Sequence, residues 1–282
     1  MRRLLLLCAL FVCSFSAFAA KGPGAVRKQI ESSLLVDGTI DITATGEVVA
    51  HTLDKPEQLP KGILEMAART LPQWKFEPVA LQGKTVSRSK MTLLFIARKL
   101  DDGRYAIDLR SASFYSMNPQ DHISVAPTGN PRLTYPMPLM RVGVSGTIYL
   151  QMKIDRDGKV ANIDASHVDL RVVGSEADMK RWRSIMARSS IETVRKWRFV
   201  VPESGPDANT DFWFGTLPVN YLFEAEKPAE YGRWQTYVAG PKALIPWLQD
   251  TRLSGENIDA LAPNRFHTAG SDRRLLTPLT GD

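Results

Sequence analysis

The feature that most constrains this fold is an alternating stretch from Val144 to Ile154 that leads into a glycine turn. Its even positions are Val, Gly, Ile, Leu, Met and Ile, while most of its odd positions are polar. This period of two predicts a strand with one buried face. Asp157-Gly158 follows as a turn, because glycine accepts a positive φ without steric cost. We therefore expect Lys159 to Ala165 to return as the second strand of a hairpin.

A helical period follows the hairpin. Large apolar side chains recur at Met179, Trp182, Met186, Val194 and Trp197, and this spacing predicts a helix with one core-facing stripe. Aromatic rings where a helix passes into a strand commonly fill the space between helix and sheet. We assign that packing role, in preference to ligand stacking, to Trp74, Phe76, Trp197 and Phe199.

Several short motifs occur in a fixed order within residues 132–199. They are Tyr135-Pro136, Gly146-Thr147-Ile148, Asp157-Gly158-Lys159-Val160, and Trp197-Arg198-Phe199 with Pro202. In this order the segment resembles the C-terminal domain of the TonB energy-transducer family. In that family a short segment of an outer-membrane receptor pairs with an exposed sheet edge, and force from the cytoplasmic membrane passes along it.

The first half of the chain has a similar plan. Alternation predicts strands over residues 34–43 and 105–109, and a continuous apolar run predicts a strand over 91–97. Residues 49–53 are expected to return as a strand after the turn at 45–48, and helical spacing predicts a helix over 63–71. Gly46-Glu47-Val48 corresponds to Gly158-Lys159-Val160, and Trp74-Lys75-Phe76 corresponds to Trp197-Arg198-Phe199. We predict two degenerate copies of one unit; the alternative is coincidence among common turn and aromatic residues.

The predicted fold class is α+β, with two TonB-C-like units that each pack a small antiparallel sheet on one main helix. The predicted domains are a signal peptide (1–19), a degenerate TonB-C-like domain (20–110), a linker (111–131), a TonB C-terminal-like domain (132–226) and a partly disordered tail (227–282). Within the tail we expect a short helix around Trp247 and disorder from Asn264 onward. Its Trp234, Tyr237 and Trp247 either pack back on the domain or form a docking patch.

The N-terminus has the pattern of an export signal. Arg2-Arg3 precede an apolar run from Leu4 to Phe18, and Ala17-Phe18-Ala19 offers small residues for cleavage before Ala20. The alternative is a retained inner-membrane anchor, although a span needs about 20 apolar residues. The only cysteines, Cys8 and Cys13, lie inside this segment, so we expect a periplasmic chain without disulfides.

The charge pattern favours a solvated surface. Removal of Arg2 and Arg3 lowers the formal charge from +6 to +4, and the remaining basic residues are dispersed among acidic ones. Nucleic-acid binding would require a concentrated basic patch. We expect no nucleic-acid partner.

Motifs for chemistry are absent from the sequence. His51, His122, His167 and His267 have no metal-ligand spacing with one another or with cysteine. Asp155-Arg156-Asp157-Gly158 begins like a calcium loop, but Lys159 and Ala161 do not continue the ligand series. We therefore predict no cofactor, no metal and no enzymatic activity; a hydrolase that uses Asp155 with Asp157 is kept as an alternative.

The functional prediction rests on a strand after the second unit. Leu217, Val219, Tyr221 and Phe223 alternate, and Pro218, which lacks an N–H, belongs on an edge or at the start of a strand. The predicted partner-binding edge consists of Leu217, Val219, Asn220, Tyr221, Leu222 and Phe223. An exposed edge can accept a strand from a partner.

The predicted function is that of a periplasmic, non-enzymatic TonB-like protein that binds envelope or outer-membrane proteins or peptides by strand addition. The alternative is a membrane-anchored energy transducer for receptor transport. A cleaved signal would leave no stable membrane anchor. Homodimers by edge pairing or swapping are a further option.

Overall fold

The structure is a computed structural model that describes residues 22–81, 83–204, 208–223, 226–248, 261, 266–268 and 273–279. The segment predicted to be a signal peptide or an anchor lies outside the described residues. Among the helices that are described, none is long and apolar enough to cross a membrane.

The elements of the first half are α1 (Pro23–Arg27), β1 (Ile30–Ile42), β2 (Val48–Leu53), η1 (Pro56–Gln58), α2 (Lys61–Thr70), η2 (Leu71–Gln73), β3 (Ser87–Lys99) and β4 (Tyr105–Tyr115). Those of the second half are η3 (Pro119–Asp121), β5 (Ser124–Val125), α3 (Met137–Met140), β6 (Gly146–Asp155), β7 (Val160–Leu170), α4 (Glu176–Val194), β8 (Phe199–Val200) and β9 (Phe212–Tyr221). The tail contributes β10 (Gln235–Val238), η4 (Pro246–Leu248) and β11 (His267–Thr268).

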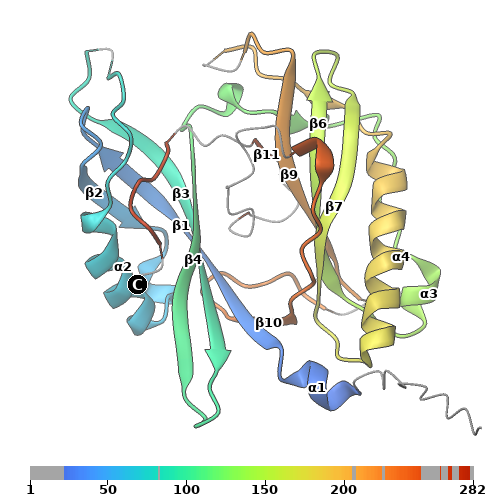
Figure 1. Cartoon of the computed structure of the whole chain (residues 1–282). Coiled ribbons are helices and arrows are strands. Elements are labelled where there is room, and N and C mark those ends of the chain that lie inside the picture. Colours follow the sequence, from blue (N-terminus) through green and yellow to red (C-terminus); the bar gives the residue numbers. More distant parts are fainter. Residues whose placement is uncertain are drawn as a thin grey trace, which may run out of the picture.

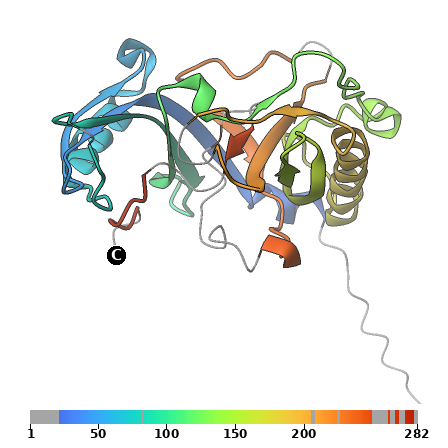
Figure 2. The same ribbon diagram turned by 90° about the horizontal axis from the view of Figure 1, so that it is seen from above.

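One antiparallel sheet of nine strands joins both halves (Figure 1). Its order is β11-β9-β6-β7-β10-β1-β3-β4, and β2 also pairs with β1. Strand β10 connects the halves, because it pairs with residues Ile30 to Ser33 of β1 and, at Val238, with Leu170 of β7. Figure 2 shows α2 and α4 at opposite ends of the molecule. The α+β class predicted from the sequence is confirmed.

The predicted hairpin and helix of the second half are confirmed. Strands β6 and β7 flank a turn in which Gly158 has φ 71°. Helix α4 begins after Ser175, whose side chain accepts a hydrogen bond from the Asp178 N–H. Met179, Met186 and Val194 are buried as predicted.

Trp197 lies beyond the end of α4 and is only partly buried, with its indole N–H donating to the Pro131 carbonyl at 2.8 Å. The buried core role predicted for this ring is therefore only partial. Its counterpart Trp74 is 1% exposed and makes edge contacts with Phe76 and Phe114.

The strands and helix predicted in the first half are also present, although β4 extends to Tyr115 and thus includes residues 111–115 of the predicted linker. Further along this linker, the Asp121 carboxylate accepts hydrogen bonds from Ser116, Asn118 and Ser204. These bonds lower the pKa of Asp121, with the bond from Ser116 as the largest cause. Asp121 thus joins this part of the linker to Ser204.

The two halves share several geometric details. The strand order is β2-β1-β3 in one and β7-β6-β9 in the other. Gly46 (φ 83°) and Gly158 (φ 71°) each accept a backbone hydrogen bond, from Phe76 at 2.8 Å and from Phe199 at 2.9 Å. Each half has its own buried apolar cluster.

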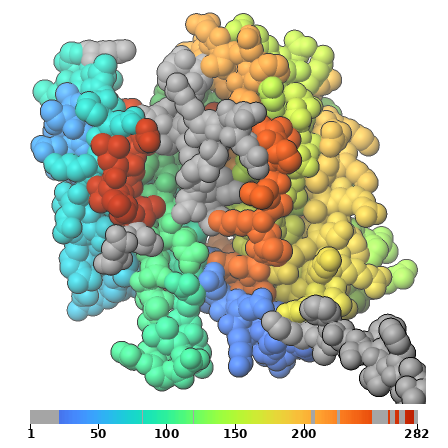
Figure 3. Space-filling view, viewed as in Figure 1, coloured from blue at the N-terminus to red at the C-terminus, as the bar shows by residue number. Residues whose placement is uncertain are grey.

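The tail was predicted to be disordered from Asn264 onward, but His267, Thr268 and Leu275 of that segment form strand pairs or bridges. Besides β10 and β11, Leu275 bridges to Phe76, and Arg274 forms an ion pair of 2.8 Å with Glu77. Figure 3 shows these C-terminal residues, in red, lying against the first half. Helix η4 lies where a short helix was predicted, and Trp247 packs on Phe214. The other tail residues lie outside the described ranges.

Candidate strand-docking edge

Strand β9 has one fully paired side and one sparsely paired side. It pairs with β6 from Asp155↔Phe212 to Gly146↔Tyr221. On its other side, the described residues provide only β11, which pairs with Gly215 and Thr216. We call this second side, from Phe212 to Tyr221, the outer edge of β9. No described strand pairs with residues 217–221 there.

The apolar side chains predicted at this edge belong to the core. Leu217, Val219 and Tyr221 are 1%, 3% and 4% exposed. The Tyr221 hydroxyl lies 2.8 Å from the Ser190 hydroxyl of α4, and burial raises the pKa of Tyr221. These three side chains cannot contact a partner without unpacking the core, so an approaching segment would meet mainly backbone groups.

A polar cluster fixes the C-terminal end of β9. The Asn220 side-chain oxygen accepts hydrogen bonds from the Thr147 hydroxyl and, at 3.1 Å, from the Arg171 guanidinium. Burial lowers the pKa of Arg171, while the nearby Glu226 carboxylate opposes this shift. Glu226 in turn accepts a hydrogen bond from Ser145 at 2.8 Å. This end of the strand is thus held by bonds to β6 and β7.

Two of the predicted edge residues lie past the strand. Leu222 and Phe223 follow β9 and are partly exposed, and the Phe223 ring packs on Tyr135 at 6.2 Å. Pro218 lies inside β9 opposite Tyr149 of β6, where its missing N–H removes one hydrogen-bond donor from the strand. The structure thus brings five of the seven residues from 217 to 223 into one strand.

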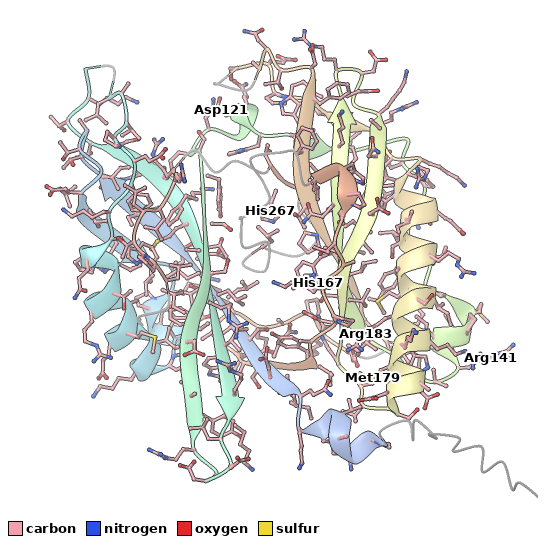
Figure 4. All side chains as sticks on the ribbon, in the orientation of Figure 1. Asp121, Arg141, His167, Met179, Arg183 and His267 are labelled. Carbon is pink, nitrogen blue, oxygen red and sulfur yellow. The ribbon has the colours of Figure 1, made fainter. Side chains whose placement is uncertain are left out.

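The four histidines do not form a cluster. His51 is in β2 and His122 follows η3, where its Nε2 lies 2.9 Å from the Ser116 carbonyl oxygen. His167 of β7 is stacked on Tyr149 at 4.2 Å, and His267 is in β11 (Figure 4). Within the described ranges, no group of three His, Cys, Asp or Glu side chains could hold a metal ion.

The Asp155 and Asp157 carboxylates have turn-stabilising roles. Asp155 Oδ1 accepts backbone hydrogen bonds from Asp157 at 3.0 Å and from Lys159 at 2.8 Å. Lys159 also donates a side-chain hydrogen bond to Asp157, which lowers the pKa of that carboxyl. The lowered pKa of Asp157 favours its ionised form and does not favour a protonated general acid at that position.

Sequence reasoning missed the tail strands β10 and β11. Their paired lengths are only four and two residues, too short for a periodic pattern. The one local signal for β11 is Phe266, a large apolar residue that precedes the paired His267 and Thr268 in an otherwise polar segment.

Comparison with known proteins supports the resemblance of the second half. Residues 131–223 match the family model of the Gram-negative bacterial TonB protein C-terminal. The matched range begins ahead of α3 and ends two residues after β9. No curated protein and no solved structure matches the chain.

Proposed function

We propose that this chain is a TonB-like protein of the cell envelope that binds an extended segment of another envelope or outer-membrane protein along the outer edge of β9. One observation carries the proposal: β9 lies within the range that matches the TonB family, and among the described residues only β11, with two residue pairs, lies on its outer side. Peptide N–H and C=O groups on such an edge can pair with an incoming strand.

Because the side chains at 217, 219 and 221 are buried, a bound segment would contact mainly the backbone of this edge. The edge would contribute main-chain hydrogen bonds, which recognise an extended backbone without regard to most of its sequence. Side-chain selectivity would come from Asn220 within the strand and from Leu222 and Phe223 just after it. We therefore infer a binding module, with no catalytic step.

The proposal can be tested on the exported form, residues 20–282. Pull-down from envelope extract should recover a protein, and peptides from that protein should shift the amide resonances of residues 217–223 other than Pro218, which has no N–H. The amides of β4, the strand at the opposite end of the sheet, serve as the internal control and should not shift. The proposal would be refuted if no protein were recovered and the amide resonances in 217–223 did not shift.

A membrane-anchored energy transducer is the second candidate. The apolar run from Leu4 to Phe18, together with the family match, favours it. The two candidates differ in whether this run is cleaved in the cell. Intact-mass analysis distinguishes them, because a purified chain that starts at Ala20 has lost the anchor, whereas one that retains residues 1–19 has kept it.

We further propose that the chain contains two degenerate copies of one unit, in residues 20–110 and 132–226, joined by 111–131 and followed by the tail 227–282. The shared strand order, the separate apolar clusters and the equivalent glycine turns at Gly46 and Gly158 support this division. Separate expression of residues 132–226 provides the test: the two-copy proposal predicts cooperative unfolding of this piece.

Periplasmic location and a homodimer complete the proposal. The export pattern of residues 2–19 and the lack of cysteine from residue 20 onward support the former. The described sheet ends in β4 on one side and in the two-residue β11 on the other, which supports the latter, because two copies can pair edge to edge at end strands. Cell fractionation and sedimentation of the purified chain test these two statements separately.

A further inference from the structure

The outer edge of β9 is already occupied at one point by the chain's own tail. His267 and Thr268 pair antiparallel with Thr216 and Gly215. We propose that residues 266–268 are a built-in cover of this edge, and that a partner replaces them with an extended segment carrying an aromatic side chain at the place of Phe266. This inference rests on the proposed function and adds the chemistry and the regulation of the binding.

Phe266 anchors the cover. Its side chain is 4% exposed and belongs to the apolar cluster of the second half. Its ring makes an edge contact with Phe199, with the two ring centroids 5.3 Å apart. An aromatic side chain buried at one end of a short paired segment supplies most of the hydrophobic energy of such a contact.

Gly215 leaves the space that the cover fills. A Cβ atom at this position would lie 2.4 Å from the Phe266 ring and 2.3 Å from the His267 carbonyl oxygen. No larger residue fits while the tail is docked. The outer edge of β9 therefore has a specific place for an aromatic ring followed by two extended residues, and this place is part of the packed structure.

In the first half, the strand that corresponds to β9 is β3, and its outer side is covered along its length by β4. The corresponding side of β3 pairs with β4 through ten residue pairs, from Lys90↔Tyr115 to Lys99↔Tyr105. The cover on β9 has two pairs. Because each net backbone hydrogen bond contributes only about 1 kcal/mol, two pairs hold a segment far more weakly than ten. The β11 cover is therefore the replaceable one.

The tail is also attached on both sides of the cover. Strand β10 precedes it, and the bridge between Leu275 and Phe76 follows it. Neither attachment involves residues 266–268, so their release from β9 does not require that β10 or the Leu275 bridge be broken. Tethering gives the cover an effective concentration on the order of millimolar, so a free segment competes poorly until the cover is weakened or a partner offers more contacts.

The test uses a fluorescently labelled peptide with the chain's own sequence from 264 to 270, Asn-Arg-Phe-His-Thr-Ala-Gly. Binding is measured by anisotropy on residues 20–282 and on two variants that release the cover. Phe266→Ala removes the anchor, and His267→Pro disrupts strand pairing while keeping the anchor. Leu244→Ala is the control, because Leu244 is a tail residue whose side chain is 85% exposed.

We expect both release variants to bind the peptide at least about tenfold more tightly than the unmodified chain, since the tethered competitor is weakened. The control should bind like the unmodified chain, and a peptide with alanine in place of phenylalanine should not bind. If Phe266→Ala does not fold, as judged by near-ultraviolet circular dichroism, His267→Pro alone decides. Equal peptide binding by the unmodified chain and by the folded release variants would overturn the inference.

The pull-down from envelope extract, repeated with the release variants, distinguishes a failure of this inference from a failure of the proposed function. If the unmodified chain and the folded release variants captured the same amount of partner, the inference that residues 266–268 cover the edge would be overturned. The proposal of strand addition would still stand. Peptide binding by the release variants with no captured protein would support the cover and count against the proposed function. Increased capture by the release variants would support both.

Discussion

Replacement of Gly158 by alanine tests the turn on which the second half is built. Gly158 has φ 71°, and a Cβ atom there would lie 2.0 Å from the Phe199 carbonyl oxygen. The left-handed conformation costs an alanine about 1–2 kcal/mol. Relief of the backbone clash adds about 1–3 kcal/mol, as for other overpacked sites. We therefore expect Gly158→Ala to lower the free energy of unfolding by about 2–5 kcal/mol.

Two further glycines provide a second test of this prediction and a matched control. Gly46 has the same surroundings, with φ 83° and a Cβ position 2.0 Å from the Phe76 carbonyl oxygen, so Gly46→Ala should cost about as much. Gly103 is the matched control: its φ is 85°, but no atom lies within 4 Å of the Cβ position. Gly103→Ala should therefore cost only the conformational part, about 1–2 kcal/mol.

Urea denaturation of residues 20–282, followed by tryptophan fluorescence, measures all three variants. The reasoning predicts a large loss for Gly46→Ala and Gly158→Ala and a small one for Gly103→Ala. If Gly103→Ala were as destabilising as the other two, the left-handed conformation alone would explain the losses, and the close approach to the two carbonyl groups would be refuted as their cause.

Three other perturbations give distinct results. Trp74→Ala should cost about 3–5 kcal/mol because the ring is fully buried, and Trp197→Ala clearly less because its ring is half-buried; equal shifts of the urea midpoint would contradict this. Hydrogen bonds from Arg88 hold the pKa of Asp41 below its usual 3.8, so this pair stabilises the fold above that pH and the contribution disappears as the pH falls through the lowered value. The stability advantage of the unmodified chain over Asp41→Asn should therefore shrink as the pH falls from about 5 to below 3.8, as measured by thermal unfolding; a constant difference would count against the ion pair. Arg183 of α4 donates hydrogen bonds to backbone carbonyls of β7, of β10 and of the residue after β10. Arg183→Met should therefore lower the free energy of unfolding by about 1.5–3 kcal/mol and speed amide exchange in β10 more than in β3. Equal acceleration in both strands would refute a local role of Arg183 at β10.

Much of the local structure follows from the sequence because it depends on short-range patterns. Period-two alternation located β1, β4, β6 and β9, a continuous apolar run located β3, and glycine turns placed β2 and β7 as returning strands. Helical spacing located α2 and α4. The end of α4 was less well predicted. The apolar stripe continues to Trp197, but the helix ends at Val194, because residues after it turn to bring Phe199 onto Gly158.

The candidate edge was predictable only in part. The alternation at residues 217–223 identified the strand, and Pro218 indicated a place where a donor is not needed. The pattern did not reveal that the apolar side chains of this strand are in the core, or that Phe266 packs beside it. Both depend on neighbours that are remote in the sequence.

The sequence by itself determined the units of this protein: three hairpins with glycine turns, two helices and an outer strand. Each is specified by residues within a few positions of one another, through alternation, helical period and the φ that glycine allows. Only the tertiary structure decided that the halves form one sheet through β10 and that β11 lies on the edge predicted to bind a partner. Pairings of two to four residues leave no periodic signal, because their stability comes from the edges and pockets offered by distant parts of the chain.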